Sequence, residues 1–389
     1  MGNSPARDLV YLDHAATTPT RPVVVEAMLP FLTDVYGNPS GGHGVARAAK
    51  TALEAAREQL AADLGAGADE VVFTSGGTEA DGLALKGAAH AARDADPGRD
   101  GVVVSAFEHK AVLASAARLS ADGFRVTYVP VDRAGLVGLH GLADALDERT
   151  AVVSVMSVNN EVGTVQPLSD VAQMVRERAP RAALHTDAVQ AAPWLDVAAL
   201  TAPADLVTIS AHKLGGPKGM GALVVRRGTR IRAVADGGGQ ERGLRSGTVD
   251  VAGAVGFAAA LHEATTTRGA EVARVSVLRD RLARGVLERC RGAWCNGDGA
   301  RKVAGNVNVG FPGVDAQTLL VVLDTLGVCA SAGSSCSSGA IEPSHVLLAM
   351  GLSPEHARAS IRLTLGWSST DADVDAALDA IPDAVQRLS

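Results

Sequence analysis

The sequence has few cysteines and few aromatic residues, with four cysteines and 3% aromatics in 389 residues. So few cysteines do not make a disulfide framework of the kind that small secreted domains use. The cysteines stand at positions 290, 295, 329 and 336, so four residues separate the first two and six separate the last two. These gaps differ from the two-residue gap of structural zinc sites, and we expect no metal site.

The sequence also lacks a long apolar run and an excess of basic residues. No stretch approaches the roughly 20 apolar residues that a membrane-spanning helix needs, so we expect no membrane segment. The opening residues, MGNSPARDLVYLDHAATTP, contain no apolar core of a secretory signal. The formal net charge of −7 argues against nucleic acid as the main ligand, because phosphate backbones are bound by basic surfaces. We therefore expect a cytoplasmic protein.

Between residues 45 and 225, β-rich runs alternate with alanine-rich segments. The segments 45–65, 78–92 and 109–119 have the composition of helices. The β-rich runs are nearly continuous apolar stretches, which is typical of strands buried on both faces of a parallel sheet. They are 70–75, 101–106, 125–131, 151–158, 182–187 and 206–211. This alternation predicts an α/β fold, with a mostly parallel sheet flanked by helices.

The pattern changes after about residue 250. A long helical region, 250–289, leads to a shorter helix near 315–326 and then to a loop rich in serine and glycine. We interpret this part as a smaller α+β domain, because a chain of this length exceeds one ordinary core. We expect a large domain at 16–260 and a small domain at 261–389, with 1–15 packing on the small one and one helix spanning the boundary.

Polar residues follow five of the β-rich runs. They lie in TSGGTEA (74–80), FEHKA (107–111), VNNEVG (158–163), HTDAVQ (185–190) and SAHK (210–213). Ligands of open α/β sheets bind beyond the carboxyl ends of the strands. Five such segments together therefore indicate one shared site.

The first of these segments contains SGGTE, which has the chemistry of a phosphate cradle. Gly76 and Gly77 allow a close approach of the backbone, and Thr78 can cap the helix that follows. An ordinary strand-to-helix turn with a threonine cap explains the motif equally well.

The other segments supply an acid, an amide, a histidine and an amine. Asp187 can pair with a protonated ring nitrogen and Gln190 with a neighbouring oxygen, although Asp187 is equally well explained as a helix cap. His109, taken alone, reads as an ordinary core or surface histidine. Lys213 directly follows an apolar run, where a desolvated amine becomes a nucleophile toward carbonyls. We prefer Lys213 to Lys218 for this reason.

A phosphate cradle, an acid for a pyridinium and a lysine together indicate pyridoxal 5'-phosphate.

Seven motifs, in order from about residue 10 to residue 370, closely resemble those of the cysteine desulfurases. These are fold-type-I pyridoxal-phosphate enzymes of the class V aminotransferase group. The motifs are LDHAATTP, FTSGGTEADGLALKG, EHKAV, VNNEVGTVQP, SAHKLGGPKGMGAL, GGGQERGLRSGT and SAGSSCSSGAIEPSHVL.

The resemblance implies a role for each candidate residue. By it, Lys213 forms the Schiff base with the cofactor, His109 stacks on the cofactor ring and shuttles protons, and Arg362 binds the substrate carboxylate. Three further residues are implied to contact the ring or its substituents: Asp187 at the pyridine nitrogen, Gln190 at the ring hydroxyl, and Asn160. The implied phosphate ligands are Gly77, Thr78, Ser210 and His212, together with Thr248 from the partner subunit of a homodimer.

The resemblance also implies the reaction and its nucleophile. Cys336 lies among small polar residues that predict a mobile loop, of the longer type found in this family, with the access that thiolate chemistry needs. Cys329 ends an apolar stretch and reads as a buried structural thiol. The implied activity converts L-cysteine to L-alanine and leaves a persulfide on Cys336. Its sulfur would then pass to an acceptor such as an iron–sulfur scaffold or a thiolation protein.

Two alternatives remain open. A selenocysteine lyase or another aminotransferase-like enzyme would share every feature except the role of the cysteine, because fold alone does not specify the reaction. A non-catalytic relative acting as a binding partner would be expected to lack Lys213, Asp187 or Cys336, and all three are present.

Overall fold

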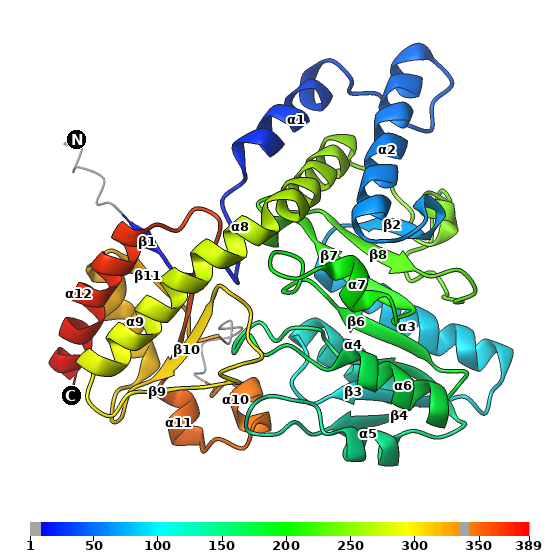
Figure 1. Ribbon diagram of the computed structural model, residues 1–389. Coiled ribbons are helices and arrows are strands. Elements are labelled where there is room, and N and C mark those ends of the chain that lie inside the picture. The colour runs from blue at the N-terminus through cyan, green and yellow to red at the C-terminus, as the bar shows by residue number, and fades with distance from the viewer. Residues whose placement is uncertain (1–8, 334–341, 389) are drawn as a thin grey trace.

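The structure, a computed structural model, describes residues 9–333 and 342–388. Its larger part is built on a seven-stranded sheet with the order β2-β8-β7-β6-β5-β3-β4 (Figure 1). The strands are β2 (Val71–Thr74), β3 (Gly101–Ser105), β4 (Arg125–Val129), β5 (Thr150–Ser154), β6 (Ala183–Asp187), β7 (Leu206–Ser210) and β8 (Gly221–Val225). In this sheet β8 runs opposite to the other six strands, so its pairings with β2 and β7 are antiparallel and all other pairings are parallel. The predicted α/β fold is therefore confirmed, and each of the six predicted runs contains a strand.

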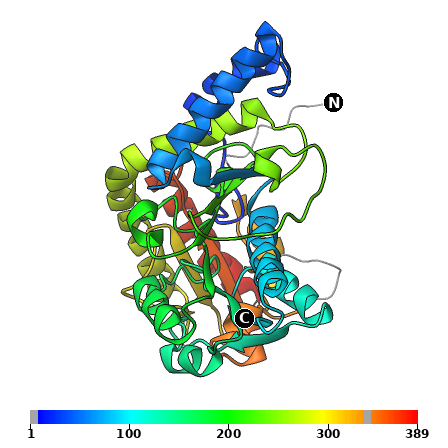
Figure 2. The ribbon, with the colours of Figure 1, turned by 90° about the vertical axis from the view of Figure 1, so that its right-hand side faces the viewer.

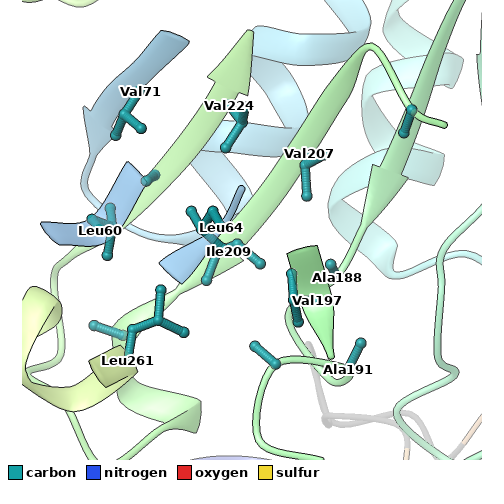
Figure 3. Packing of buried hydrophobic residues seen from close by; sticks show 14 of the residues in the cluster. Leu60, Leu64, Val71, Ala188, Ala191, Val197, Val207, Ile209, Val224 and Leu261 are labelled. Atoms are coloured by element: carbon teal, nitrogen blue, oxygen red, sulfur yellow. The ribbon is translucent and has the colours of Figure 1, made fainter. Parts of the chain in front are cut away.

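The strands are buried on both faces, as their continuous apolar sequences predict. In β3, Val102 and Val104 belong to one buried cluster while Val103, between them, belongs to the other. The first face is covered by α3 (Gly77–Ala95) and α4 (Lys110–Ala121). The second is covered by α5 (Leu139–Ala145), α6 (Leu168–Arg178) and α7 (Val197–Thr201), and Figure 3 shows part of its packing around Val207 and Ile209.

A second, smaller group of strands lies beside this sheet. The antiparallel order β12-β10-β9 joins β12 (Ser360–Thr364), β10 (Asn306–Gly310) and β9 (Trp294–Cys295). Near them, β1 (Val10–Tyr11) pairs in parallel with β11 (Val328–Cys329). The helices of this part are α9 (Ala316–Thr325), α10 (His345–Ala349), α11 (Pro354–Arg358) and α12 (Asp371–Leu388).

The two parts are joined by α8 (Val251–Arg289), a single helix of 39 residues. Its start is defined by Asp250, whose side chain accepts a hydrogen bond from the Gly253 amide at 2.9 Å. Leu261 of α8 belongs to the core of the larger part, and Leu278 belongs to the core of the smaller part. Val10, near the start of the described chain, also packs in the smaller core. Because the helix runs without a break through residues 260 and 261, the division at that point stays a prediction.

Two helices near the start of the described chain, α1 (Pro22–Thr33) and α2 (Gly44–Asp63), pack against α8. Val24 of α1 and Leu53 and Leu60 of α2 belong to the core of the larger part. Figure 2 shows the two helices extending toward one end of the molecule. Three short 3₁₀ turns, η1 (Ala68–Glu70), η2 (Ala211–Lys213) and η3 (Glu241–Gly243), complete the elements. In the parts of the chain that the structure describes, no helix is both long and apolar enough to cross a bilayer.

Candidate active site

A cavity of about 380 Å³ lies where the carboxyl ends of the strands meet the smaller part of the molecule. Its wall includes ten of the residues singled out in the sequence, nine from the five polar segments and Arg362 from a sixth. They are Gly77, Thr78, His109, Asn160, Asp187, Gln190, Ser210, His212, Lys213 and Arg362. The prediction that the five polar segments share one site is thus supported by geometry, while the role of each residue stays a prediction.

Two predicted residues are not in this wall. Thr248 is exposed and lies outside the cavity of its own chain. Cys336 lies outside the described residues. The residues on either side of its segment do reach the cavity, because Gly333 and His345 both line it.

Lys213 projects from the turn η2, directly after β7. Its amine donates hydrogen bonds to the carbonyl oxygens of Ala15 and Ala16, each at 2.6 Å. Burial, followed by repulsion from Arg362, lowers the pKa of the amine from its usual value to about 8. The competing residue Lys218 is exposed and does not line this cavity. The geometry therefore favours Lys213 as the reactive amine.

The acid and the histidine of the site are held by local hydrogen bonds. Asp187 ends β6, and its Oδ1 accepts a hydrogen bond from the amide of Val189 at 2.9 Å. It therefore fixes a turn and faces the cavity as well. The alternative interpretation of Asp187 as a helix cap is wrong, because residues 189–194 form turns and the next helix, α7, begins at Val197. Burial raises the pKa of its carboxyl, an effect that His109 counteracts. His109 caps α4 through a 3.2 Å hydrogen bond from the Ala111 amide to Nδ1, and burial lowers its pKa.

The turn between β2 and α3 differs from the sequence prediction in one respect. Thr78 was expected to cap α3, but the helix begins at Gly77 and Gly76 occupies the cap position. Gly76 has a φ of 146°, a conformation that glycine adopts without steric cost. No side chain of the described residues caps the helix, and Oε2 of Glu79 accepts a 2.7 Å hydrogen bond from the amide of Ser75, which precedes the cap position. The amides at the start of α3 stay free to face the cavity.

The residues of the cavity fit pyridoxal phosphate. The hydroxyl of Ser210 is buried and has no hydrogen-bond partner among the described residues, so it is available to a phosphate oxygen. It lies in the same wall as Gly77 and Thr78 at the start of α3, where a helix terminus attracts anions. Asp187 offers a buried carboxylate to the pyridine nitrogen, and Lys213 offers an amine to the aldehyde.

Arg362, in β12, is buried and contacts two groups of the protein. Its Nη2 contacts Oδ1 of Asp13 at 2.7 Å, and its Nη1 donates to the carbonyl of Asn160 at 3.1 Å. Gln190 donates from Nε2 to the carbonyl of Ala15 at 2.9 Å. The segment that follows β1 therefore forms one wall of the site.

Sequence reasoning missed several charged residues of the cavity. They are Asp13, Asp81, Lys110, Glu161 and His345. Each lies in a motif quoted above, so the signal was present but assigned to a neighbouring residue. Burial raises the pKa of Asp81 well above its usual value, and proximity to Asp187 raises it further.

The structure describes three of the four cysteines, Cys290, Cys295 and Cys329. No group of three or more histidine, cysteine, aspartate or glutamate side chains that could hold a metal ion occurs within the described ranges. Cys329, predicted to be buried, is only half-buried, because β11 pairs with the two-residue strand β1 near the surface. Burial still raises the pKa of this thiol, and the nearby carboxylates of Asp324 and Asp13 raise it further.

Comparison with known proteins agrees with this geometry. Residues 10–377 match the model of the aminotransferase class-V family. The chain is 42% identical over 380 residues to the cysteine desulfurase IscS of Clostridium botulinum (strain Kyoto / Type A2), covering 97% of this chain and 94% of that protein. A solved structure named NifS-like protein superposes with a TM-score of 0.91 at 36% identity, covering 98% of this chain and all of that one, 100%.

A second solved structure, named SspA in complex with cysteine, has a TM-score of 0.80 at 33% identity and covers 91% of this chain and 98% of its own. The family match spans most of the chain, and the sequence and structural similarities extend over nearly its whole length. The chain therefore belongs to the class-V aminotransferase family and, within it, to the cysteine desulfurases.

Proposed function

We propose that this pyridoxal-phosphate enzyme is an L-cysteine desulfurase, which converts L-cysteine to L-alanine and transfers the sulfur to an acceptor protein. The observation that carries the proposal is the meeting of Lys213, Asp187 and Arg362 in one cavity. These three side chains offer an amine of lowered pKa, a buried carboxylate and a guanidinium. Together they match an amino acid substrate bound beside the cofactor.

The residues have distinct tasks in this proposal. Arg362 binds the α-carboxylate of cysteine, because a guanidinium matches a carboxylate in shape and charge. The cofactor, when bound, supplies the electron sink that makes the α-proton of the substrate acidic. Lys213 takes and returns that proton, since an amine with a pKa of about 8 is partly unprotonated near neutral pH. His109 moves a second proton at the same face of the cavity.

We propose that Cys336 receives the sulfur. Its thiolate attacks the sulfur of the substrate, a sulfur–sulfur bond forms and the carbon–sulfur bond breaks. The β-carbon of the substrate takes up a proton and leaves as the methyl group of alanine, while Cys336 holds a persulfide. This step is supported by the positions of Gly333, directly before residues 334–341, and His345, shortly after them, because both line the cavity.

We propose a homodimer in which Thr248 completes the phosphate site of the partner subunit. Thr248 is exposed and does not line the cavity of its own chain, which supports such a role. Helix α1 and the residues after it expose large apolar side chains, and such surfaces mark protein interfaces. They are Val23, Val25, Leu29, Leu32 and Tyr36.

The acceptor is proposed to be an iron–sulfur scaffold or a thiolation protein, and the location to be the cytoplasm. The similarity to the cysteine desulfurases named IscS supports an iron–sulfur scaffold as the acceptor.

The proposal is tested by incubating the holoenzyme with L-cysteine and a thiol reductant and measuring sulfide and alanine. We expect the two products in equal amounts. Parallel incubations test the two alternative activities: L-selenocysteine is the substrate for a selenocysteine lyase, and an amino donor with a 2-oxo acid is the substrate pair for an aminotransferase. Release of alanine from selenocysteine only, or amino transfer without sulfide, would replace the desulfurase by one of those two activities.

A further inference from the structure

The guanidinium of Arg362 meets an acidic residue of the protein inside the cavity. Nη2 pairs with Oδ1 of Asp13 at 2.7 Å, and Nη1 donates a hydrogen bond to the carbonyl oxygen of Asn160. Nε is buried and has no partner among the described residues. The exposed fraction is 4% for the Arg362 side chain and 21% for that of Asp13, so the pair is well shielded and the carboxylate still reaches the cavity.

Asp13 is held in this position by the backbone. It forms a parallel bridge with Thr364, two residues after Arg362 in β12. The Thr364 amide donates to the carbonyl of Leu12 at 2.7 Å, and the Ala15 amide donates to the Thr364 hydroxyl at 2.9 Å. These contacts on both sides of Asp13 fix its carboxylate against the guanidinium.

The same carboxylate acts on the reactive amine. The chain continues from Asp13 to Ala15 and Ala16, whose carbonyls hold Lys213. Arg362 lowers the pKa of Lys213, and Asp13 raises it. Other charged groups lining the cavity are Lys110, Asp187 and Glu161, with His109 and His345 as titratable neighbours. Asp13 is therefore the acidic residue that directly pairs with the cation proposed to bind substrate.

A substrate carboxylate that binds Arg362 approaches an ion pair and not a free cation. Two carboxylates on one guanidinium repel each other, which weakens binding. At the same time, Asp13 and the Asn160 carbonyl hold the plane of the guanidinium. Two of the five N–H donors are used in these contacts, so the hydrogen of Nε and one hydrogen each of Nη1 and Nη2 remain to bind a carboxylate, and this restricts its orientation.

We propose that Asp13 is a positioning residue for the substrate: it weakens the binding of the α-carboxylate to Arg362 and in return fixes the orientation in which that carboxylate is held. This inference rests on the proposed function, in which Arg362 binds the substrate carboxylate. Catalysis gains from correct orientation more than from tight ground-state binding.

The test is the isosteric substitution Asp13→Asn in the holoenzyme. It removes the competing charge and frees Arg362 to turn, so we expect the KM for L-cysteine to fall about fivefold and kcat to fall about tenfold. A residue with only a structural role would give the opposite change in KM, because a disturbed site binds substrate less well. An unchanged or higher KM would overturn the proposal.

A matched control is Asp69→Asn. Asp69 also pairs with an arginine at 2.7 Å, through Nη2 of Arg227, but both side chains are exposed and far from this cavity wall. We expect its kinetic constants to equal those of the unmodified enzyme. Thermal unfolding of both variants shows whether either substitution disturbs folding.

A second measurement does not require turnover. L-Alanine is titrated against the holoenzyme and its binding is followed by the visible absorbance of the cofactor. We expect Asp13→Asn to bind L-alanine about fivefold more tightly, and to show no such gain when combined with Arg362→Gln. Equal gains with and without Arg362 would refute the role of Asp13. If Arg362→Gln alone leaves the affinity unchanged, the proposed carboxylate site itself is wrong, and the two failures are thereby distinguished.

Discussion

The amine of Lys213 lies 2.6 Å from the carbonyl oxygen of Ala15, a residue 198 positions earlier in the chain. A second carbonyl, that of Ala16, receives another hydrogen bond from the same amine. The two backbone dipoles stabilise the charged amine, while burial and Arg362 destabilise it. The site is therefore assembled from both parts of the molecule, and its reactive amine is held by the segment that follows β1.

The pKa of Lys213 predicts how the apoprotein takes up its cofactor. A lysine with a lowered pKa is protonated and unreactive below that value and becomes a nucleophile above it. We expect the rate of pyridoxal phosphate incorporation to rise with pH and to level off above about 8. An ordinary lysine would level off only near pH 10.5. Stopped-flow absorbance between pH 6 and 10 measures this rate, within the range in which circular dichroism shows the protein to be folded.

The attachment point is checked on the same material. Borohydride reduction followed by peptide mapping should locate the cofactor on Lys213. The exposed residue Lys218 serves as the internal control, because it differs in burial and lies only five residues away in the sequence. A reduced adduct on Lys218 would show that the amine was wrongly assigned.

The buried hydroxyl of Ser210, for which the described part of the chain offers no hydrogen-bond partner, predicts a loss of cofactor affinity in Ser210→Ala. A hydrogen bond to a charged group is worth about 1.5–3 kcal/mol, so we expect pyridoxal phosphate to bind roughly tenfold more weakly or worse. Equilibrium dialysis of the apoprotein measures the dissociation constant. Ser154→Ala is the control, because Ser154 is also buried but bonds to His185 at 2.8 Å and does not line the cavity. Equal losses in both variants would argue against a phosphate contact at Ser210.

Cys336 is predicted to carry the sulfur. Cys336→Ser should retain the cofactor and release almost no sulfide, because a serine hydroxyl is hardly ionised at neutral pH. Cys329→Ser should keep the activity, since that thiol lies in β11 and has a raised pKa. Mass spectrometry after incubation with L-cysteine should find one added sulfur on the peptide that contains Cys336. A persulfide on Cys329, or normal turnover by Cys336→Ser, contradicts the mechanism.

The exposed apolar residues of α1 predict that dimerisation is required for activity. Leu29 and Leu32 are 53% and 60% exposed, and replacing both by aspartate should shift the protein to a monomer. We expect such a monomer to lose most activity and to bind the cofactor more weakly, because Thr248 of a partner would be missing. Sedimentation velocity and activity are measured together over a dilution series. Val321→Asp, at a residue that is 66% exposed on α9, is the control for adding charge to an apolar surface position. A fully active monomer would disprove the requirement.

Local sequence patterns predicted every strand of the central sheet except β8, together with α2, α3, α4, α8 and α9. The run 101–106 became β3 and the helical region 250–289 became α8, because continuous apolar stretches and uninterrupted helix formers report on structure within a few residues. The strand-end rule placed Asp187 and Lys213 in one cavity, since parallel strands end at the same edge of a sheet. The motif SGGTE predicted the turn correctly but assigned the cap to Thr78, because cap preferences do not fix the residue at which a helix begins.

The tertiary structure alone determined how these elements act on one another. The pairing of Asp13 with Arg362 joins residues 349 positions apart, and no local pattern contains that distance. It follows from the parallel bridge between Asp13 and Thr364, a contact that depends on how the chain folds as a whole. The same holds for the lowered pKa of Lys213, because burial and the nearest charges are properties of the assembled cavity. Sequence therefore determined which chemical groups the site contains, through short-range patterns, and folding determined their charge and mutual contacts, through long-range packing.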